Sequence, residues 1–365
     1  MKTGRCNVLL FSCLLFLFSG CSHQRTAFYT SADFEKTPKI DVHFHYNTSD
    51  ATFIEFADSL NFRFVSPNVD AGLSIDRQLQ FSKNLKLKQP DKFSFFGTFS
   101  VANYGKPGFA KQVIARIDTC IRAGASGIKI WKNIGMVLKD SLGRYVMADN
   151  PAFEPIFNYL ETNNIPLMGH LGEPKNCWLP DEKMTLDNDR RYFREHPEYH
   201  MYLHPEAPTY EAQVEARDNI LRKHPNLNFI GAHLGSLEWS IDELAQRLDL
   251  FPNFNVDFSA RIGHLEYQSS IDREKVRQFM IRYQDRLLYG TDGSIGENIT
   301  DGAAKRKSLR HEWFQQWLYL ATDSMVVVKD LGDLKVRGLQ LPREAIDKIY
   351  CKNAERLLKL KSQSR

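Results

Sequence analysis

The sequence predicts one large α/β domain, a (β/α)8 TIM barrel with an insertion after the fifth strand. Brief apolar runs alternate with segments of helical periodicity, which is typical of right-handed βαβ units and a parallel sheet. Eight such runs occur, as an eight-stranded barrel requires. The chain has 365 residues, more than the roughly 250 of a typical barrel, so it has room for an insertion. An open, doubly wound sheet is the alternative fold.

The expected elements follow one another along the chain. Strands are expected at residues 40–46, 62–69, 93–101, 127–131, 166–171, 227–233, 254–259 and 286–292. Helices are expected between them, for example at residues 108–123, 152–162, 210–224, 237–249 and 272–283, with a last amphipathic helix at residues 342–360. Residues 173–208 form the longest connection and are rich in charged and aromatic side chains, which indicates the insertion. No GxGxxG loop follows the first strand, which argues against a dinucleotide-binding sheet.

The first 20 residues have the pattern of a lipoprotein signal peptide. Lys2 and Arg5 precede an apolar run at residues 8–18, which is too short to span a bilayer because a spanning helix needs about 20 residues. The sequence then resembles the lipobox of bacterial lipoproteins, so Cys21 is the expected site of lipid attachment. An ordinary secretory signal is the alternative. Residues 21–37 are expected to form a polar tether, and residues 38–365 the barrel.

Composition and cysteine use exclude several classes of protein. With 42% hydrophobic and 25% charged residues, the chain is neither disordered nor a multi-span membrane protein. Its formal net charge of +4 is too small to indicate a nucleic-acid partner without a clustered basic face. Beyond the signal and Cys21, three widely spaced cysteines remain, which predict neither a disulfide framework nor a cysteine zinc site: Cys120, Cys177 and Cys351.

Histidines and one aspartate stand where expected strands end. His43 and His45 are two residues apart on the first strand, so both imidazoles are expected on one face, at the end of the barrel where active sites occur. His170 ends the fifth strand, His233 the sixth and Asp292 the eighth. Glycines precede each of these three residues and let side chains from separate strands converge. The set predicts a site for a divalent metal ion, with Zn²⁺ the first choice.

The order of these motifs resembles the amidohydrolase superfamily. The motifs are HxH, Gly-His-Leu-Gly around His170, Gly-Ala-His-Leu-Gly around His233, and Leu-Leu-Tyr-Gly-Thr-Asp ending at Asp292. The resemblance extends from about residue 40 to residue 360 and is strongest to the amidohydrolase-related group that includes the carboxymuconate-semialdehyde decarboxylases. It implies a TIM barrel with a single metal ion, held by His43, His45, His170 and Asp292. It also implies that His233 is the catalytic histidine beside the reacting water.

The residue types suit hydrolysis. A bound divalent cation can lower the pKa of water from 15.7 to about 7 and can polarise a carbonyl. Asp292 could accept the proton of that water, and His233 could stabilise the developing oxyanion and then donate a proton. The expected function is hydrolysis of an ester, lactone or amide bond in a small substrate, with or without a carboxylate. Non-oxidative decarboxylation is one alternative, and a non-catalytic envelope lipoprotein that uses the barrel as a binding module is the other.

Four further residues are candidates for substrate contact. Lys129 is expected to point into the barrel, where it would bridge two metal ions, bind a substrate carboxylate or form a buried ion pair. Trp131 would form a wall of the substrate site or pack in the core. Glu173 would line the pocket or cap a helix. Arg261, just beyond the seventh strand, would clamp an anion or form a surface ion pair.

The expected partners follow from the site and from the signal. One is a small-molecule substrate, and the other is a membrane of the bacterial cell envelope, reached through lipid on Cys21. The protein would lie on the periplasmic or the cell-surface side, and secretion is the alternative. Assembly into a homo-oligomer is left open.

Overall fold

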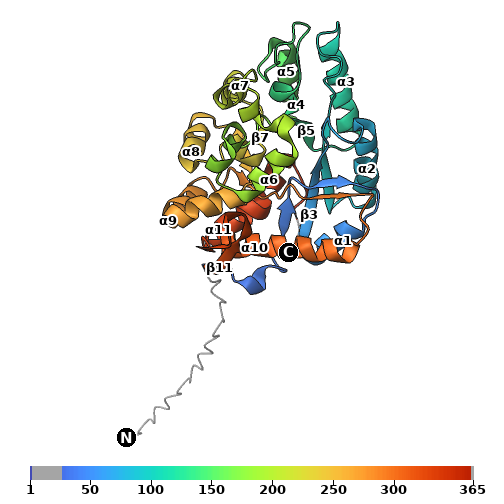
Figure 1. The fold of residues 1–365 in the computed structure, drawn as a ribbon. Coiled ribbons are helices and arrows are strands. Elements are labelled where there is room, and N and C mark those ends of the chain that lie inside the picture. Colours follow the sequence, from blue (N-terminus) through green and yellow to red (C-terminus); the bar gives the residue numbers. More distant parts are fainter. Residues whose placement is uncertain (2–26, 363–365) are drawn as a thin grey trace.

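The computed structural model describes residue 1 and residues 27–362, and an eight-stranded parallel sheet within them curls into a barrel (Figure 1). The strands follow the order β1-β3-β4-β5-β6-β7-β8-β9. Backbone hydrogen bonds also join the segments that follow the first and last strands, β1 and β9: the Val42 N–H donates to Tyr289 O (3.0 Å), and the Asp292 N–H donates to His43 O (2.8 Å). The predicted barrel fold is therefore confirmed.

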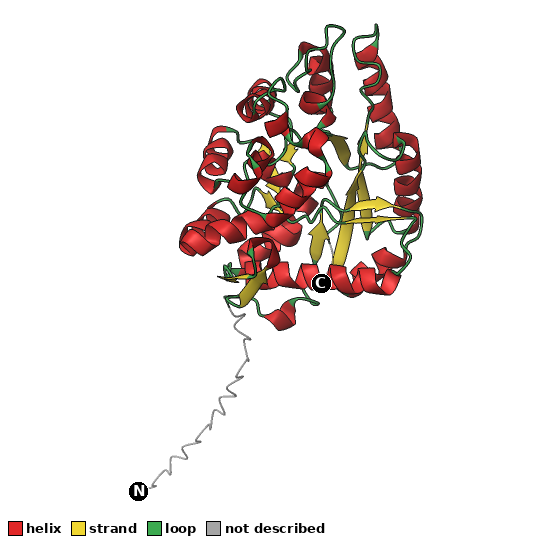
Figure 2. Cartoon of the chain, viewed as in Figure 1, coloured by secondary structure: helices red, strands yellow, loops and turns green. Residues whose placement is uncertain are grey.

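Helices surround this barrel on the outside (Figure 2). The barrel strands are β1 (Lys39–Asp41), β3 (Phe62–Pro67), β4 (Phe93–Thr98), β5 (Gly127–Ile130), β6 (Leu167–Gly169), β7 (Phe229–Gly231), β8 (Phe254–Asp257) and β9 (Leu287–Leu288). The helices are α1 (Thr52–Ser59), α2 (Ile75–Lys88), α3 (Phe109–Arg122), α4 (Asn133–Met136), α5 (Glu154–Thr162), α6 (Asp187–Glu195), α7 (Tyr210–Lys223), α8 (Ile241–Leu250), α9 (Ile262–Arg282), α10 (Gly302–Ala321), α11 (Arg343–Asp347) and α12 (Asn353–Leu358). Two small sheets lie outside the barrel, a parallel pair of β2 (His45–Asn47) with β10 (Ser294–Gly296) and an antiparallel pair of β11 (Met325–Val328) with β12 (Leu334–Arg337).

The C-terminal segment closes the end of the barrel at which the strands begin. Apolar side chains from the strands fill the barrel and pack against α12, and they include Val65, Met168 and Ile230. The Asn353 amide donates to Gln284 O and Leu287 O, which ties α12 to the start of β9. The predicted last helix is thus present, but it is divided into α11, a π-helical turn and α12.

The first predicted strand is interrupted, which corrects the prediction for residues 40–46. β1 ends at Asp41 and β2 begins at His45, so His43 lies on the irregular link between them. The Asp41 carboxylate accepts a hydrogen bond from the His43 N–H (3.1 Å), and β2 leaves the barrel to pair with β10. The two imidazoles still lie side by side, with ring centroids 5.3 Å apart. Their proximity therefore comes from this bend and not from the alternation of a continuous strand.

Residues 27–37, the described part of the predicted tether, pack on the barrel. The prediction of a tether is therefore wrong for these residues. Phe34 is only 1% exposed and lies against α10, where its ring meets those of Phe314 and Trp317. The Tyr29 hydroxyl donates to Asp347 in α11 (2.6 Å), and the Trp317 indole N–H donates to Thr30 O (3.0 Å). Aromatic residues in a mostly polar segment are the reason that it folds back. The predicted signal peptide and Cys21 lie outside the described residues.

The insertion after the fifth barrel strand is confirmed and forms a small subcore. It consists of α6 and several 3-10 turns between β6 and α7. Its apolar side chains form a cluster of their own beside the barrel, which includes Cys177, Met184 and Phe193. The insertion thus has its own packing and holds α6 near the ends of the strands.

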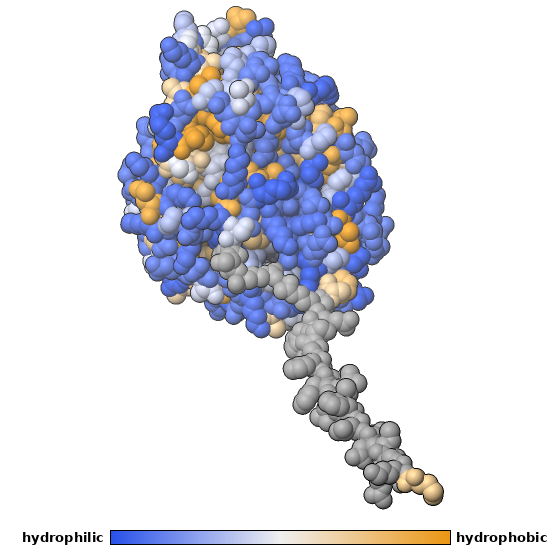
Figure 3. Space-filling view, turned by 180° about the vertical axis from the view of Figure 1, so that it is seen from behind, coloured by the Kyte–Doolittle hydropathy of each residue, from blue (hydrophilic) through white to orange (hydrophobic). Residues whose placement is uncertain are grey.

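The face shown in Figure 3 is mainly hydrophilic, and apolar patches are scattered over it. Cys120, Cys177 and Cys351 are buried and free, as expected of a chain without a disulfide framework. Among the helices in the described part of the chain, none combines the length and the apolar character that crossing a bilayer requires.

Candidate metal centre

Three of the predicted ligands meet at the ends of β1 and β9. Asp292 Oδ1 lies 3.4 Å from His43 Nε2 and 3.2 Å from His45 Nε2. Ligands placed tetrahedrally at the usual 2.0–2.1 Å from a zinc ion lie roughly 3.4 Å from one another. The spacing of His43, His45 and Asp292 therefore fits three ligands of one ion.

Two more imidazoles point their free nitrogens into the same region. The rings of His170 and His233 are 4.2 Å apart, and the Nε2 atom of each is buried without a hydrogen-bond partner among the described residues. Burial holds the pKa of both histidines well below the ordinary value, so both are neutral and keep a lone pair for a metal or a proton. Buried polar atoms without a partner are costly, and a bound cation would satisfy them. The donor set thus fits a divalent ion, although His170 lies outside the tight group of His43, His45 and Asp292.

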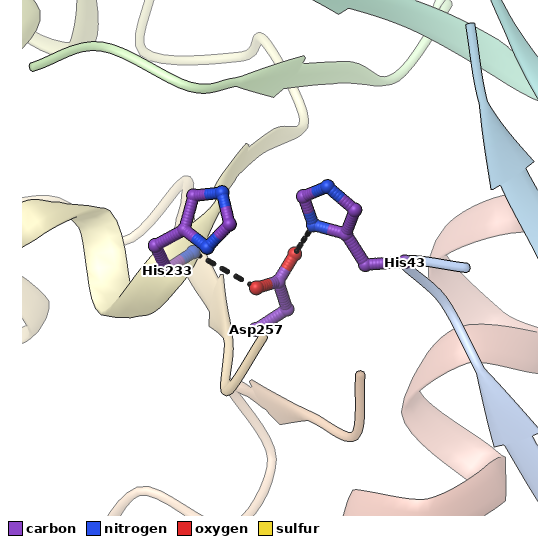
Figure 4. Close-up of side chains that lie close together, drawn as sticks. All are labelled: His43, His233 and Asp257. Carbon is purple, nitrogen blue, oxygen red and sulfur yellow. Dashed lines mark hydrogen bonds and ion pairs between the residues drawn. The ribbon is translucent and has the colours of Figure 1, made fainter. Parts of the chain in front are cut away.

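Asp257, the last residue of β8, orients this set and was not predicted from the sequence. Its Oδ2 accepts the Nδ1–H of His43 (3.0 Å), and its Oδ1 accepts the backbone N–H of His233 (2.9 Å) (Figure 4). A carboxylate can only accept here, so His43 carries its proton on Nδ1 and leaves Nε2 free. His43, His233 and Asp257 are also close enough to hold an ion themselves. Their hydrogen bonds already use these atoms, so we assign Asp257 an orienting role.

His233 and Asp292 sit in strained backbone. The φ angles of His233, Ala260 and Asp292 are 59°, 53° and 64°, in the left-handed region that residues other than glycine rarely adopt. Such conformations cost about 1–3 kcal/mol each and cluster at functional sites. Here the left-handed turns lie just beyond the ends of three neighbouring strands, where they direct side chains toward the centre.

Burial and the neighbouring imidazoles set the charge state of Asp292. Its side chain is 32% exposed, and burial disfavours its charge. The imidazoles of His43, His233 and His45 nevertheless hold the pKa of the Asp292 carboxyl well below its usual range, so it is ionised at neutral pH.

Lys129 points into the barrel as predicted and is fully buried. Its Nζ lies 3.3 Å from His43 Nε2, and no carboxylate of the described residues forms an ion pair with it. Burial lowers the pKa of Lys129 to about 8, despite the carboxylates of Asp257 and Asp292. The structure therefore gives no support to the ion-pair alternative and places the amine beside the candidate metal ligands.

A small pocket of about 150 Å³ opens beside these groups. The predicted residues His170, Glu173, His233, Arg261 and Asp292 line it. Residues from the insertion and from the segments after β5 and β8 complete the wall: Lys132, Pro174, Asn188, Asp189, Tyr192, Phe193 and Ala260. A larger hollow of about 1180 Å³ lies beside the N-terminal segment and α11, and it contains none of the histidines predicted for the site.

Lys132 takes the place in this wall that the sequence suggested for Trp131. Trp131, expected either to form a wall of the substrate site or to pack in the core, lies just beyond β5, which ends at Ile130. Trp131 packs edge-on against Tyr199 and does not line the pocket. Lys132 is buried instead against the Glu173 carboxylate and the Tyr192 hydroxyl. Glu173 lines the pocket, which is one of the two roles considered for it, the other being a helix cap.

Comparison with known proteins gives the family of this chain. Among solved structures, it is similar to dihydroorotase from Saccharomyces cerevisiae, at 12% identity over 90% of this chain and 85% of that chain, with a TM-score of 0.46. It is also similar to an amidohydrolase from Pseudomonas aeruginosa, at 11% identity over 91% and 99% of the two chains, with a TM-score of 0.42. A search of curated proteins gave no match. The family model for amidohydrolase matches residues 97–360, more than half of the sequence, and the chain therefore belongs to the amidohydrolase family.

Proposed function

We propose that this protein is a metal-dependent hydrolase that cleaves an ester, lactone or amide bond in a small molecule. As a member of the amidohydrolase family, it is an enzyme with a small-molecule substrate. The observation that carries the proposal is the convergence of His43 Nε2 and His45 Nε2 on Asp292 Oδ1, at 3.4 and 3.2 Å. Beside them lie the Nε2 atoms of His170 and His233, which have no hydrogen-bond partner among the described residues, although His170 Nε2 is 3.5 Å from Glu173 Oε2.

His43, His45, His170 and Asp292 would hold the metal, with Zn²⁺ the best match to nitrogen and carboxylate donors. When bound, the ion supplies Lewis-acid chemistry, which activates water and polarises a carbonyl. Asp257 keeps His43 in the tautomer whose Nε2 can bind. The family match begins at residue 97, so the roles of His43 and His45 rest on their geometry.

His233 and Asp292 would move the protons. Asp292 is an ionised carboxylate at the edge of the pocket, where it can accept a proton from an attacking water. The Nδ1–H of His233 donates to Ser259 O (2.8 Å), which fixes the ring with Nε2 toward the pocket. From there Nε2 can take over the proton that Asp292 accepts, and the imidazolium so formed can stabilise charge that develops on the carbonyl oxygen and then deliver this proton to the leaving group.

Substitution of the ligands tests this proposal. His43→Ala and Asp292→Ala should each lose the bound metal, because each removes one of its donors. The turnover number of each variant should fall at least about 100-fold. Metal content by mass spectrometry and hydrolysis of a panel of lactones, esters and amides are the measurements. His196→Ala, in an exposed part of the insertion, is the matched control and should change neither. Full activity in either ligand variant would refute the assignment.

Decarboxylation remains the second candidate, because the same ligands occur in the decarboxylase branch that the sequence resembles. Assaying carbon dioxide release from aromatic carboxylates separates the two reactions. Carbon dioxide release without hydrolysis of any ester, lactone or amide would favour the decarboxylase. A protein that binds metal and catalyses neither reaction would favour the binding-module alternative.

The lipid anchor is a separate proposal that rests on the sequence around Cys21. We propose that lipid on Cys21 holds the barrel at the cell envelope. Incorporation of labelled palmitate should occur in the wild type and should be lost in Cys21→Ala. Release of the unsubstituted protein from cells without any label would overturn the proposal in favour of ordinary secretion.

A further inference from the structure

Arg261 is a buried cation of the pocket whose hydrogen bonds are incomplete. It lies between β8 and α9, and only 7% of its surface is exposed. Its Nη1 donates to Ala260 O (2.9 Å), whereas Nε has no hydrogen-bond partner among residues 27–362. Its Nη2 is 3.8 Å from Glu173 Oε2, which is beyond hydrogen-bond distance. Along the Nε–Nη2 edge of this pocket-lining residue, Nε is therefore buried and unsatisfied, and Nη2 makes no hydrogen bond with the described residues.

Two carboxylates near Arg261 already have other hydrogen-bond partners, and a third, Glu238, makes no hydrogen bond with it. Glu173 accepts from Lys132, which also contacts the Tyr192 hydroxyl. Asp189 accepts hydrogen bonds from His264 (3.1 Å) and from the Asn176 amide (2.8 Å). These carboxylates balance charge in the wall, but they leave the Nε–Nη2 edge of Arg261 without a hydrogen bond.

Backbone geometry holds this edge in place. Ala260 has a left-handed φ of 53°, and its N–H donates to Thr291 O (3.2 Å), next to Asp292. Arg261 then stands at the N-terminus of α9, which is helical from Ile262 to a kink at Asp272 and whose dipole favours an anion at this end. The turn at Ala260 thus links Arg261 to Asp292, which is one of the candidate metal ligands.

We propose that the Nε–Nη2 edge of Arg261 binds a carboxylate of the substrate, so that the enzyme acts on a small molecule that bears a carboxylate beside the bond to be cleaved. This inference rests on the proposed hydrolase function. Two parallel N–H groups match the two oxygens of a carboxylate. A phosphate would bring more charge and a third oxygen, and the nearest other cation of the wall, Lys132, is already paired with Glu173. Since Arg261, His233 and Asp292 line one pocket of about 150 Å³, the anchored substrate is small and its reacting carbonyl lies close to the carboxylate.

Calorimetric titration of the metal-loaded protein tests this inference. The probes are acetate, glutarate and benzoate, with benzamide as the neutral counterpart and phenyl phosphate as the competing anion. At least one carboxylate should bind the wild type more tightly than benzamide and phenyl phosphate do. Its affinity should fall about 10- to 100-fold in Arg261→Gln, the loss expected for hydrogen bonds to a charged group. Arg261→Lys should lose affinity as well, because it keeps the charge but not the planar edge.

Arg277→Gln is the matched control, because it removes a partly exposed arginine from the same helix and should leave binding unchanged. Circular dichroism and metal content verify that the Arg261 variants are folded and loaded. A carboxylate that keeps its affinity in Arg261→Gln binds elsewhere, for example to the metal, and overturns the inference. Absence of carboxylate binding to the wild type, or tighter binding of phenyl phosphate, overturns it too.

The outcomes also separate this inference from the proposed function. Hydrolysis of uncharged esters without Arg261-dependent binding of any carboxylate would reject the inference alone. Arg261-dependent binding of a carboxylate without hydrolysis of any substrate would reject the proposed function and leave the binding site standing.

Discussion

At the scale of single residues, the orientation of the His43 imidazole depends on Asp257, a carboxylate that does not line the pocket. Asp257 is fully buried, and its carboxylate accepts hydrogen bonds from the Nδ1–H of His43 and from the backbone N–H of His233. Although burial disfavours its charge, His43 and His233 hold the pKa of the Asp257 carboxyl well below its usual range. It is therefore ionised at any pH at which the protein functions, and it acts as an acceptor only.

We predict that Asp257→Asn weakens metal binding about 10- to 100-fold, the usual cost of losing such a partner of a metal-binding histidine. An asparagine amide facing His43 would favour the tautomer with its proton on Nε2, which removes the lone pair that binds. Competition with a chelator of known affinity measures the change. Asp242→Asn, an exposed carboxylate paired with Lys275, is the control and should leave the affinity unchanged. Equal affinity in wild type and Asp257→Asn would contradict the role assigned to Asp257.

The sequence predicted the site residues that carry a local signal. His170, His233 and Asp292 each stand one or two residues after a glycine, at or just beyond the end of an apolar strand, so their convergence could be deduced from barrel geometry. Asp257 carries the same signal in weaker form, since it is an acid at the end of an apolar strand, but no neighbouring motif marked it. Lys132 could not be found in this way, because its direction depends on where β5 ends.

At the scale of elements, the N-terminal segment is part of the folded domain. Residues 27–37 bury Phe34 against α10 and bind α11 through Tyr29, so they seal the outside of the barrel next to its last helices (Figure 1). The strands and most outer helices could be predicted because their apolar periodicity is local. This segment could not, because only tertiary contacts with residues about 280 positions later decide whether it packs.

We predict that Phe34→Ala destabilises the protein by about 3–5 kcal/mol, the usual cost of removing a buried phenylalanine side chain. Unfolding in urea, followed by circular dichroism, measures the change. Leu87→Ala is the control, because Leu87 is 71% exposed and its truncation should cost less than about 0.5 kcal/mol. A loss below 1 kcal/mol for Phe34→Ala would mean that the segment is a tether after all.

At the scale of the whole molecule, metal binding and stability should be linked. The predicted ligands come from the β1–β2 link and from the ends of β6 and β9, so an ion bound there would join distant parts of the chain. We predict that removal of the metal by a chelator lowers the Tm of the wild type. A free metal concentration 100 times the Kd contributes about 2.7 kcal/mol. Asp292→Ala should show no such chelator effect, and an equal shift in both proteins would place the metal elsewhere.

A second property of the whole molecule is a fall in stability between about pH 4.5 and pH 8, which originates at Glu266 in α9. Burial, with a smaller contribution from Asp330, raises the pKa of Glu266 from 4.5 to about 8. The folded state therefore holds a proton that the unfolded state releases. The stabilisation is complete below pH 4.5 and is lost as the pH rises through about 8.

Glu266→Gln mimics the protonated side chain and should remove this dependence. We expect the variant to have a higher Tm than the wild type at pH 9, by about 2 °C for each kcal/mol regained, and a nearly equal Tm at pH 4.5. Glu274→Gln, on the same helix, is the control, because hydrogen bonding to Gln278 lowers the pKa of that carboxyl and no gain is expected at pH 9. Thermal unfolding of the three proteins across this pH range decides the matter. If Glu266→Gln and the wild type lose stability in parallel between pH 5 and pH 9, the loss of stability originates elsewhere in the molecule.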